Sequence, residues 1–141
     1  MIRRRDAMLG LLISQAAGSR AAQTQTLDAS EQLLPTAVDL NQSLALAVRQ
    51  GQPLVVLATL HGCPFCKVAR ENYLLPASRE GAVVTQIHFL SHMPLRDWAG
   101  RASTHGQMIK DLRIDVAPTL LFYGRSGQEL VPRLTAGSTS D

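Results

Sequence analysis

Residues 54–76, LVVLATLHGCPFCKVARENYLLP, hold the pattern that decides the fold. Residues 54–60 form a short, nearly continuous apolar run rich in β-branched side chains, which predicts a buried strand. His61 and Gly62 break this run, and two cysteines three positions apart follow at once. Residues 67–75 then repeat apolar side chains toward one side of a helix, which Pro76 is expected to end or kink. The cysteine pair therefore lies where a strand gives way to a helix.

A cysteine at the start of a helix is placed for sulfur chemistry. Free backbone N–H groups and the positive end of the helix dipole stabilise an ionised thiol there. Pro64 suits the first helical position, where its missing N–H costs little. The three-residue offset brings Cys66 back within bonding reach of Cys63. We therefore expect Cys63 to be the exposed nucleophile and Cys66 the more buried thiol that resolves a mixed disulfide.

The rest of the chain alternates helices and strands around this motif. One helix is expected from a cap at Asp39 or Asn41 to Gly51, and a second from a cap at Ser103 or Thr104 through His105 to Leu112. Strands are expected over 82–90 and 120–123, with a hairpin partner over 128–134. The first two strands are joined through a helix and should be parallel, whereas the hairpin makes the last two antiparallel. This order predicts an α/β domain with a mixed four-stranded sheet flanked by helices.

The chain resembles the thioredoxin superfamily over roughly residues 36–134. The resemblance rests on Cys63-Pro64-Phe65-Cys66 after a strand and on Val116-Ala117-Pro118-Thr119 before the next-to-last strand. It implies a thioredoxin fold in which Pro118 is cis and faces the cysteines, and in which the backbone of Ala117 hydrogen bonds to a bound substrate chain. Pro64 and Phe65 are then expected to contact the substrate. The aromatic spacer and the long segment 91–110 are similar to those of glutaredoxin-like and exported thioredoxin-like thiol–disulfide oxidoreductases.

The sequence departs from that family pattern in three places. No Asp or Glu occurs between Gln52 and Cys66, so a proton relay through a buried acid is not expected. The tryptophan usual before the first cysteine is replaced by Gly62, with His61 ahead of it. A protonated His61 would favour the Cys63 thiolate, whereas the alternative is a loop histidine that faces solvent; both stay open. The chain stops where the family has a closing C-terminal helix, so we expect the domain of residues 36–141 to be truncated.

The first residues look like an export signal. Arg3, Arg4 and Arg5 precede an apolar run that is too short to span a membrane, and small residues follow it. We expect a signal peptide over 1–21, with a plain amphipathic helix as the alternative, and then a flexible arm over 22–35. Export to the bacterial periplasm or beyond would allow a cysteine pair to be held oxidised.

Composition narrows the possible functions. Lys and Arg number 14 against 11 Asp and Glu, and without residues 1–21 the chain carries ten of each, so nucleic acid is excluded as a partner. We expect an exported thiol–disulfide oxidoreductase that acts on protein thiols and disulfides, with a possible membrane redox partner and no stable membrane insertion after signal removal. No organic cofactor is expected, because the chain has no phosphate-binding glycine-rich loop. No metal site is expected either.

Two other classes of function remain open. One is a copper- or zinc-binding module that uses Cys63, Cys66 and His61. His88, His92 and His105 have no tight spacing that would supply a fourth ligand. The other is an interaction domain that keeps the fold without redox activity.

Overall fold

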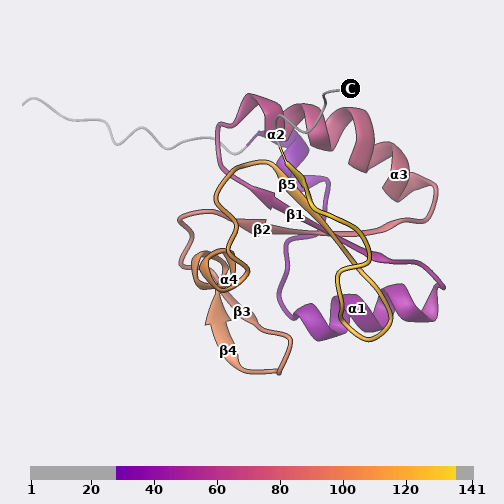
Figure 1. Ribbon diagram of the computed structural model, residues 1–141. Coiled ribbons are helices and arrows are strands. Elements are labelled where there is room, and N and C mark those ends of the chain that lie inside the picture. Colours follow the sequence, from indigo (N-terminus) through magenta and orange to yellow (C-terminus); the bar gives the residue numbers. More distant parts are fainter. Residues whose placement is uncertain (1–27, 136–141) are drawn as a thin grey trace, which may run out of the picture.

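The computed structural model describes residues 28–135, which form a central sheet between two layers of helices (Figure 1). The sheet contains β1 (Leu54–Thr59), β2 (Val83–His88), β5 (Thr119–Tyr123) and β6 (Leu134–Thr135) in the spatial order β2-β1-β5-β6. β1 and β2 are parallel, and β5 runs antiparallel to both β1 and β6. The predicted mixed four-stranded sheet is therefore confirmed, with the strand before the cysteines in its interior.

Alternate side chains of β1 enter two separate hydrophobic cores. Leu54, Val56 and Ala58 pack on one face of the sheet, and Val55 and Leu57 pack on the other. A strand covered on both faces needs apolar residues at every position, which explains the continuous apolar run in the sequence.

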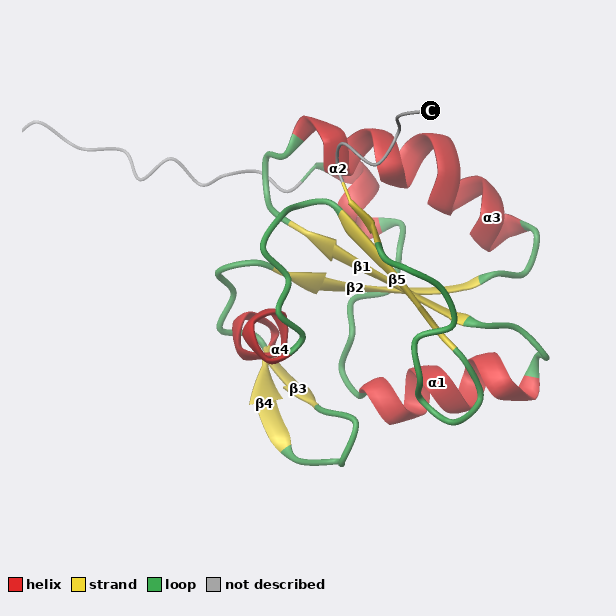
Figure 2. Cartoon of the chain, in the orientation of Figure 1, coloured by secondary structure: helices red, strands yellow, loops and turns green. Residues whose placement is uncertain are grey.

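Figure 2 shows which helices cover each face. Helices α1 (Leu40–Arg49) and α4 (His105–Asp111) lie on the first face and contribute Leu40, Ala47, Met108 and Ile109 to its core. Helices α2 (Pro64–Ala69) and α3 (Leu75–Arg79) lie on the second face. The helix that begins at the cysteine pair is thus held against the sheet on the face opposite to α1 and α4.

Side-chain caps start α1 and α4 where the sequence predicts. The Asp39 carboxylate accepts a hydrogen bond from the Gln42 N–H at 3.0 Å, and the Thr104 hydroxyl accepts one from the Gln107 N–H at 3.1 Å. Each cap satisfies a backbone donor that has no partner within its own helix.

The helix after the cysteines continues past Pro76, which does not end it. A π-helical segment, η2 (Arg70–Leu74), joins α2 to α3, and the Leu75 N–H bonds to the Arg70 carbonyl five residues back. A proline inside an α-helix removes one donor, and its ring presses on the carbonyl four residues earlier. The wider turn gives that ring room, so the helix reaches Arg79.

The segment ahead of the domain packs against the protein. Residues Ala29–Gln32 form a 3-10 helix, η1, and Leu34 is buried in the second core. The side-chain amide of Gln86 donates to the carbonyls of Glu31 at 2.9 Å and Leu34 at 3.0 Å. The prediction of a flexible arm is therefore wrong for residues 28–35, because this segment satisfies buried polar groups and fills an apolar site. The expected signal peptide, the rest of the arm and the final residues from 136 lie outside the described residues.

Two further segments differ from expectation. The polar stretch after β2 contains a small hairpin of β3 (Pro94–Arg96) and β4 (Ala102–Thr104), below α4 in Figure 1. The strand expected over 128–134 is reduced to a single bridge at Glu129 and to β6. Within residues 28–135, no helix combines the length and apolar character that crossing a membrane requires.

Candidate redox site

Cys63 caps the helix that begins with Pro64. Its sulfur accepts a hydrogen bond from the Cys66 N–H at 3.2 Å, and both cysteines are free thiols. Cys63 is partly exposed, whereas Cys66 is completely buried. This arrangement presents one sulfur to a partner and keeps the second sulfur beneath it.

Ionisation of the Cys66 thiol is strongly unfavourable. Burial raises its pKa to about 11, and its hydrogen bond with Cys63 adds to the increase. The Leu60 backbone and the Thr59 hydroxyl act in the opposite direction through hydrogen bonds. Cys66 is therefore a neutral thiol at physiological pH, and it must lose its proton in order to attack another sulfur.

The loop before β5 faces the exposed cysteine. The Cys63 thiol donates to the carbonyl of Ala117 over 3.9 Å, and the Ala117–Pro118 peptide bond is cis, the form that the resemblance implies. The Thr119 hydroxyl donates to the Val116 carbonyl at 2.6 Å, which holds this loop at the start of β5. The structure thus brings Cys63 and Ala117 together from positions 54 residues apart.

Apolar residues follow Cys63 in the chain and also occur in the loop that faces it. Pro64 is exposed and the Phe65 side chain is 69% exposed, while Pro118 is half-buried. The surface beside the accessible sulfur therefore includes an exposed aromatic ring.

His61 makes contacts that neither sequence interpretation expected. Its Nδ1 lies 2.7 Å from the Glu31 carboxylate, and its ring stacks on His88 with centroids 5.0 Å apart. About a third of the side chain is exposed. The interactions of His61 are therefore with Glu31 and His88, on the inner side of the loop that carries Cys63.

A buried arginine links Glu31 to the cysteines. Arg70 is 1% exposed, and its guanidinium contacts Glu31 at 3.5 Å and donates to the Ser30 hydroxyl at 2.9 Å. It also donates to the Thr59 hydroxyl at 2.7 Å, and Thr59 in turn hydrogen bonds with Cys66. Polar groups thus connect the carboxylate of Glu31 to the buried sulfur.

Sequence reasoning missed this network. The strand before the cysteines holds no acidic residue, and Glu31 lies in the segment that was expected to be a flexible arm. One signal was present, because Cys66, Arg70 and Leu74 recur at four-residue intervals on one face of the helix. An arginine between two buried positions needs a partner from another part of the chain.

Two buried histidines lie below His61. Burial lowers the pKa of His88 to about 4, and the neighbouring His61, His105 and Arg70 lower it further. His105 accepts the His88 backbone N–H on Nδ1 at 3.1 Å and contacts the Ala37 carbonyl through Nε2 at 2.9 Å. These contacts fix His105 in the tautomer that carries its proton on Nε2.

Comparison with known proteins assigns the family. A family model described as a thioredoxin-like domain matches residues 40–140. The chain therefore belongs to the thioredoxin superfamily, and it carries the two cysteines in the spacing used by thiol–disulfide oxidoreductases. The match begins after Glu31, so the buried network includes residues outside the matched region.

Several solved thioredoxin structures are similar to this chain. One is oxidised thioredoxin O2 from Arabidopsis thaliana, with 16% identity, a TM-score of 0.48, and coverage of 72% of this chain and 83% of that chain. Another is a thioredoxin from Thermus thermophilus, with 20% identity, a TM-score of 0.47, and coverage of 71% of this chain and 74% of that one. Thioredoxin f2 from Chlamydomonas reinhardtii has 18% identity and a TM-score of 0.42, covering 70% and 82%. No curated protein gives a significant match.

Proposed function

We propose that this protein is an exported thiol–disulfide oxidoreductase that exchanges disulfides with protein substrates through Cys63 and Cys66. The observation that carries the proposal is the contrast between the two sulfurs. Cys63 is accessible and its sulfur accepts a backbone N–H bond at a helix start, whereas Cys66 is buried within the same helical turn. An accessible sulfur can form a mixed disulfide, and a buried neighbour can displace the partner from it.

In the reducing direction, the Cys63 thiolate attacks one sulfur of a substrate disulfide. A mixed disulfide forms, and the other substrate sulfur leaves as a thiolate that takes up a proton. Cys66 loses its proton and attacks the Cys63 sulfur, so the Cys63–Cys66 disulfide forms and the second substrate thiol is released. The substrate gains two electrons and the cysteine pair loses two; the oxidising direction is the reverse of these steps.

Substrate binding is supported by the surface around Cys63. The exposed Phe65 follows the reactive cysteine by two positions, and the backbone carbonyl of Ala117 contacts its sulfur from another part of the chain. An extended substrate chain can place an apolar side chain on Phe65 while its backbone follows the Ala117 loop. Protein substrates therefore fit better than small disulfides, which would leave Phe65 uncovered.

Trapping experiments test the proposal. Purified Cys66→Ser protein should form a stable mixed disulfide with a protein substrate that contains disulfides, such as insulin, because the sulfur that resolves the bond is missing. Cys63→Ser should form none, and wild-type protein should turn over in the presence of dithiothreitol. Equal trapping by the two single variants, or turnover by Cys63→Ser, would contradict the assignment of roles.

We further propose that residues 1–21 direct export and that a membrane-bound thiol oxidant or reductant resets the cysteine pair. Cell fractionation followed by amino-terminal sequencing tests the first part, and a full-length cytosolic product would contradict it. The reduction potential of the pair, measured against glutathione, assigns the direction of electron flow. A strongly oxidising value indicates a disulfide donor, whereas a value near that of thioredoxin, about −270 mV, indicates a reductase.

A further inference from the structure

Three potential metal ligands meet on the inner side of the loop that carries the cysteines. Glu31, His61 and His88 each offer one ligand atom, and these atoms lie within 4.8 Å of one another. They come from η1, from the loop before Cys63 and from the end of β2, so residues 57 positions apart in the chain converge on one point. Neither cysteine belongs to this group, which therefore differs from the Cys63, Cys66 and His61 set considered from the sequence.

The surroundings of His88 supply a second, independent observation. His88 is 3% exposed, and its Nδ1 has no hydrogen-bond partner among residues 28–135. A buried polar atom without a partner is rare in native proteins and calls for a ligand or an ion that satisfies it. His88 also offers a ligand atom to the cluster. A cation bound there would coordinate an imidazole that is otherwise buried with incomplete hydrogen bonding.

The Glu31 carboxylate is held by a separate contact on each oxygen. Oε1 faces the Arg70 guanidinium at 3.5 Å, and Oε2 faces His61 at 2.7 Å. Arg70 thus orients the carboxylate through one oxygen and leaves the other directed at the histidines. A carboxylate held in this way resembles the hydrogen-bonded ligands of metal sites, whose outer contacts fix their orientation.

We infer that Glu31, His61 and His88 form a binding site for a divalent transition-metal ion of the zinc class. Two imidazoles and one carboxylate are one of the ligand sets of catalytic zinc sites, in which the fourth position stays open to solvent or to another ligand. His61 is about a third exposed, so water or an anion can reach that fourth position beside it. An anion there would also offset the positive charge that the ion and Arg70 place together.

The site needs only a local adjustment to close around an ion. Ligand bonds of about 2.0–2.2 Å require donor atoms about 3.4 Å apart in a tetrahedral arrangement. Glu31 and His61 already lie closer than this, and the widest separation in the cluster is within 4.8 Å. The partly exposed ring of His61 can rotate, and the ion would replace the proton now shared between Nδ1 and the carboxylate, with the ring proton moving to Nε2.

Cobalt titration of the full chain tests the inference independently of the redox function. The protein used is the Cys63→Ser/Cys66→Ser double variant, so that thiolates cannot bind the ion. Co²⁺ should bind with one-to-one stoichiometry, produce the visible bands of a tetrahedral site, and be displaced by Zn²⁺. In the diamagnetic zinc form, the ring proton resonances of His61 and His88 should shift.

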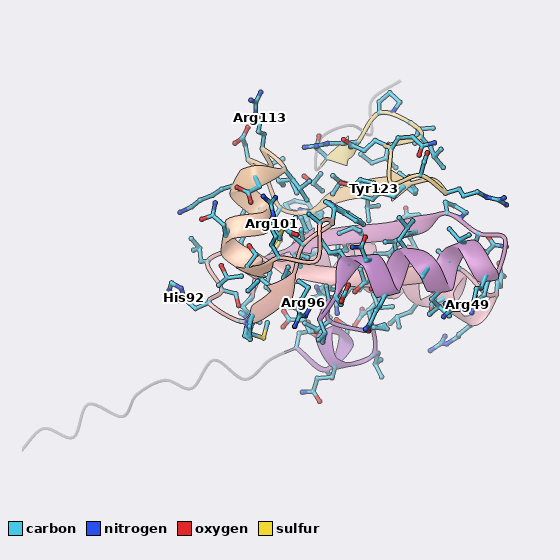
Figure 3. All side chains as sticks on the ribbon, turned by 90° about the horizontal axis from the view of Figure 1, so that it is seen from below. Arg49, His92, Arg96, Arg101, Arg113 and Tyr123 are labelled. Atoms are coloured by element: carbon cyan, nitrogen blue, oxygen red, sulfur yellow. The ribbon has the colours of Figure 1, made fainter. Side chains whose placement is uncertain are left out.

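Single substitutions in the same background locate the ion. His61→Ala should weaken Co²⁺ binding by about 100-fold or more, because loss of even an outer contact costs 10–100-fold. His61 is partly exposed, so this variant should fold. His92→Ala is the matched control, since His92 is exposed and points outward from the margin of the molecule (Figure 3), and it should bind as the parent does.

Three results would overturn the inference. The first is the absence of saturable binding in the double variant, with binding confined to wild-type protein and accompanied by thiolate charge-transfer bands. The second is unchanged affinity in His61→Ala. The third is a shift of the His92 or His105 resonances in place of those of His61 and His88.

Discussion

Arg70 is a buried charged residue whose replacement should strongly destabilise the fold without changing a cysteine. We consider Arg70→Met, which keeps a long apolar side chain in the helix and removes the charge. Arg70 is 1% exposed and its guanidinium serves three groups at once: the Glu31 carboxylate and the hydroxyls of Ser30 and Thr59. The variant would leave a carboxylate that is 2% exposed without its cation.

The expected loss follows from these contacts. Removing one member of a buried ion pair costs about 3–5 kcal/mol, because the remaining charge stays desolvated without compensation. A domain of this size has a free energy of unfolding of about 5–15 kcal/mol, so the variant should lose a large part of its stability. With a urea m-value of about 1.5–2 kcal/mol/M, the unfolding midpoint should fall by about 2–3 M.

Urea unfolding followed by circular dichroism provides the assay. Arg49→Met is the control, because Arg49 is exposed on α1 (Figure 3), and its unfolding free energy should stay within about 0.5 kcal/mol of wild type. The double variant Glu31→Gln/Arg70→Met should be more stable than the sum of the single losses, with a coupling of about 1–3 kcal/mol. An Arg70→Met loss below about 1 kcal/mol, or the absence of coupling, would refute a structural ion pair at this place.

Three further predictions concern the second sulfur, a buried tyrosine and a helix cap. In Cys63→Ser protein, iodoacetamide should modify Cys66 slowly near neutral pH and faster as the pH rises above the usual cysteine value of about 8.5, since the variant keeps burial, the largest cause of the raised Cys66 pKa. Mass spectrometry that finds a plateau near that usual value would contradict this. Burial, followed by the charge of Glu129, raises the pKa of Tyr123 to about 12. Because the folded pKa lies above the usual value of about 10, the neutral tyrosine stabilises the fold fully below pH 10, and up to about 3 kcal/mol is lost as the pH rises toward 12. Urea titrations at several pH values should show this loss in wild type and not in Tyr123→Phe. Asp39→Ala should lower the free energy of unfolding by about 1 kcal/mol and Asp39→Asn by much less, because asparagine keeps an oxygen that can cap α1.

Local patterns in the sequence predicted most of the framework. The apolar run at residues 54–60 predicted β1 because a strand covered on both faces needs apolar side chains throughout. Asp39 and Thr104 predicted helix starts because capping depends on residues only three positions apart. The start of the helix at Cys63 was predicted from equally local signals, because the strand break precedes it and Pro64 occupies its first position.

The polar interior of the site could not be predicted in this way. The contact between Glu31 and Arg70 joins positions 39 apart, and that between Glu31 and His61 joins positions 30 apart. Such pairs depend on how η1 docks against the helix after the cysteines, and no short-range periodicity encodes that docking. The same holds for β3 and β4, whose three-residue strands have only one buried side chain, Leu95, to mark them.

The packing of η1 affects where a shortened version of the domain should begin. A polypeptide trimmed to the span shared with its family would begin at residue 40 and retain both sulfurs. It would also lack Leu34, which fills one interior, and the acid that neutralises Arg70. Such a shortened polypeptide would expose to water the side of the reactive helix that η1 covers. Low activity in an assay would then reflect the missing twelve residues from Asp28 to Asp39 and not the chemistry of the cysteines.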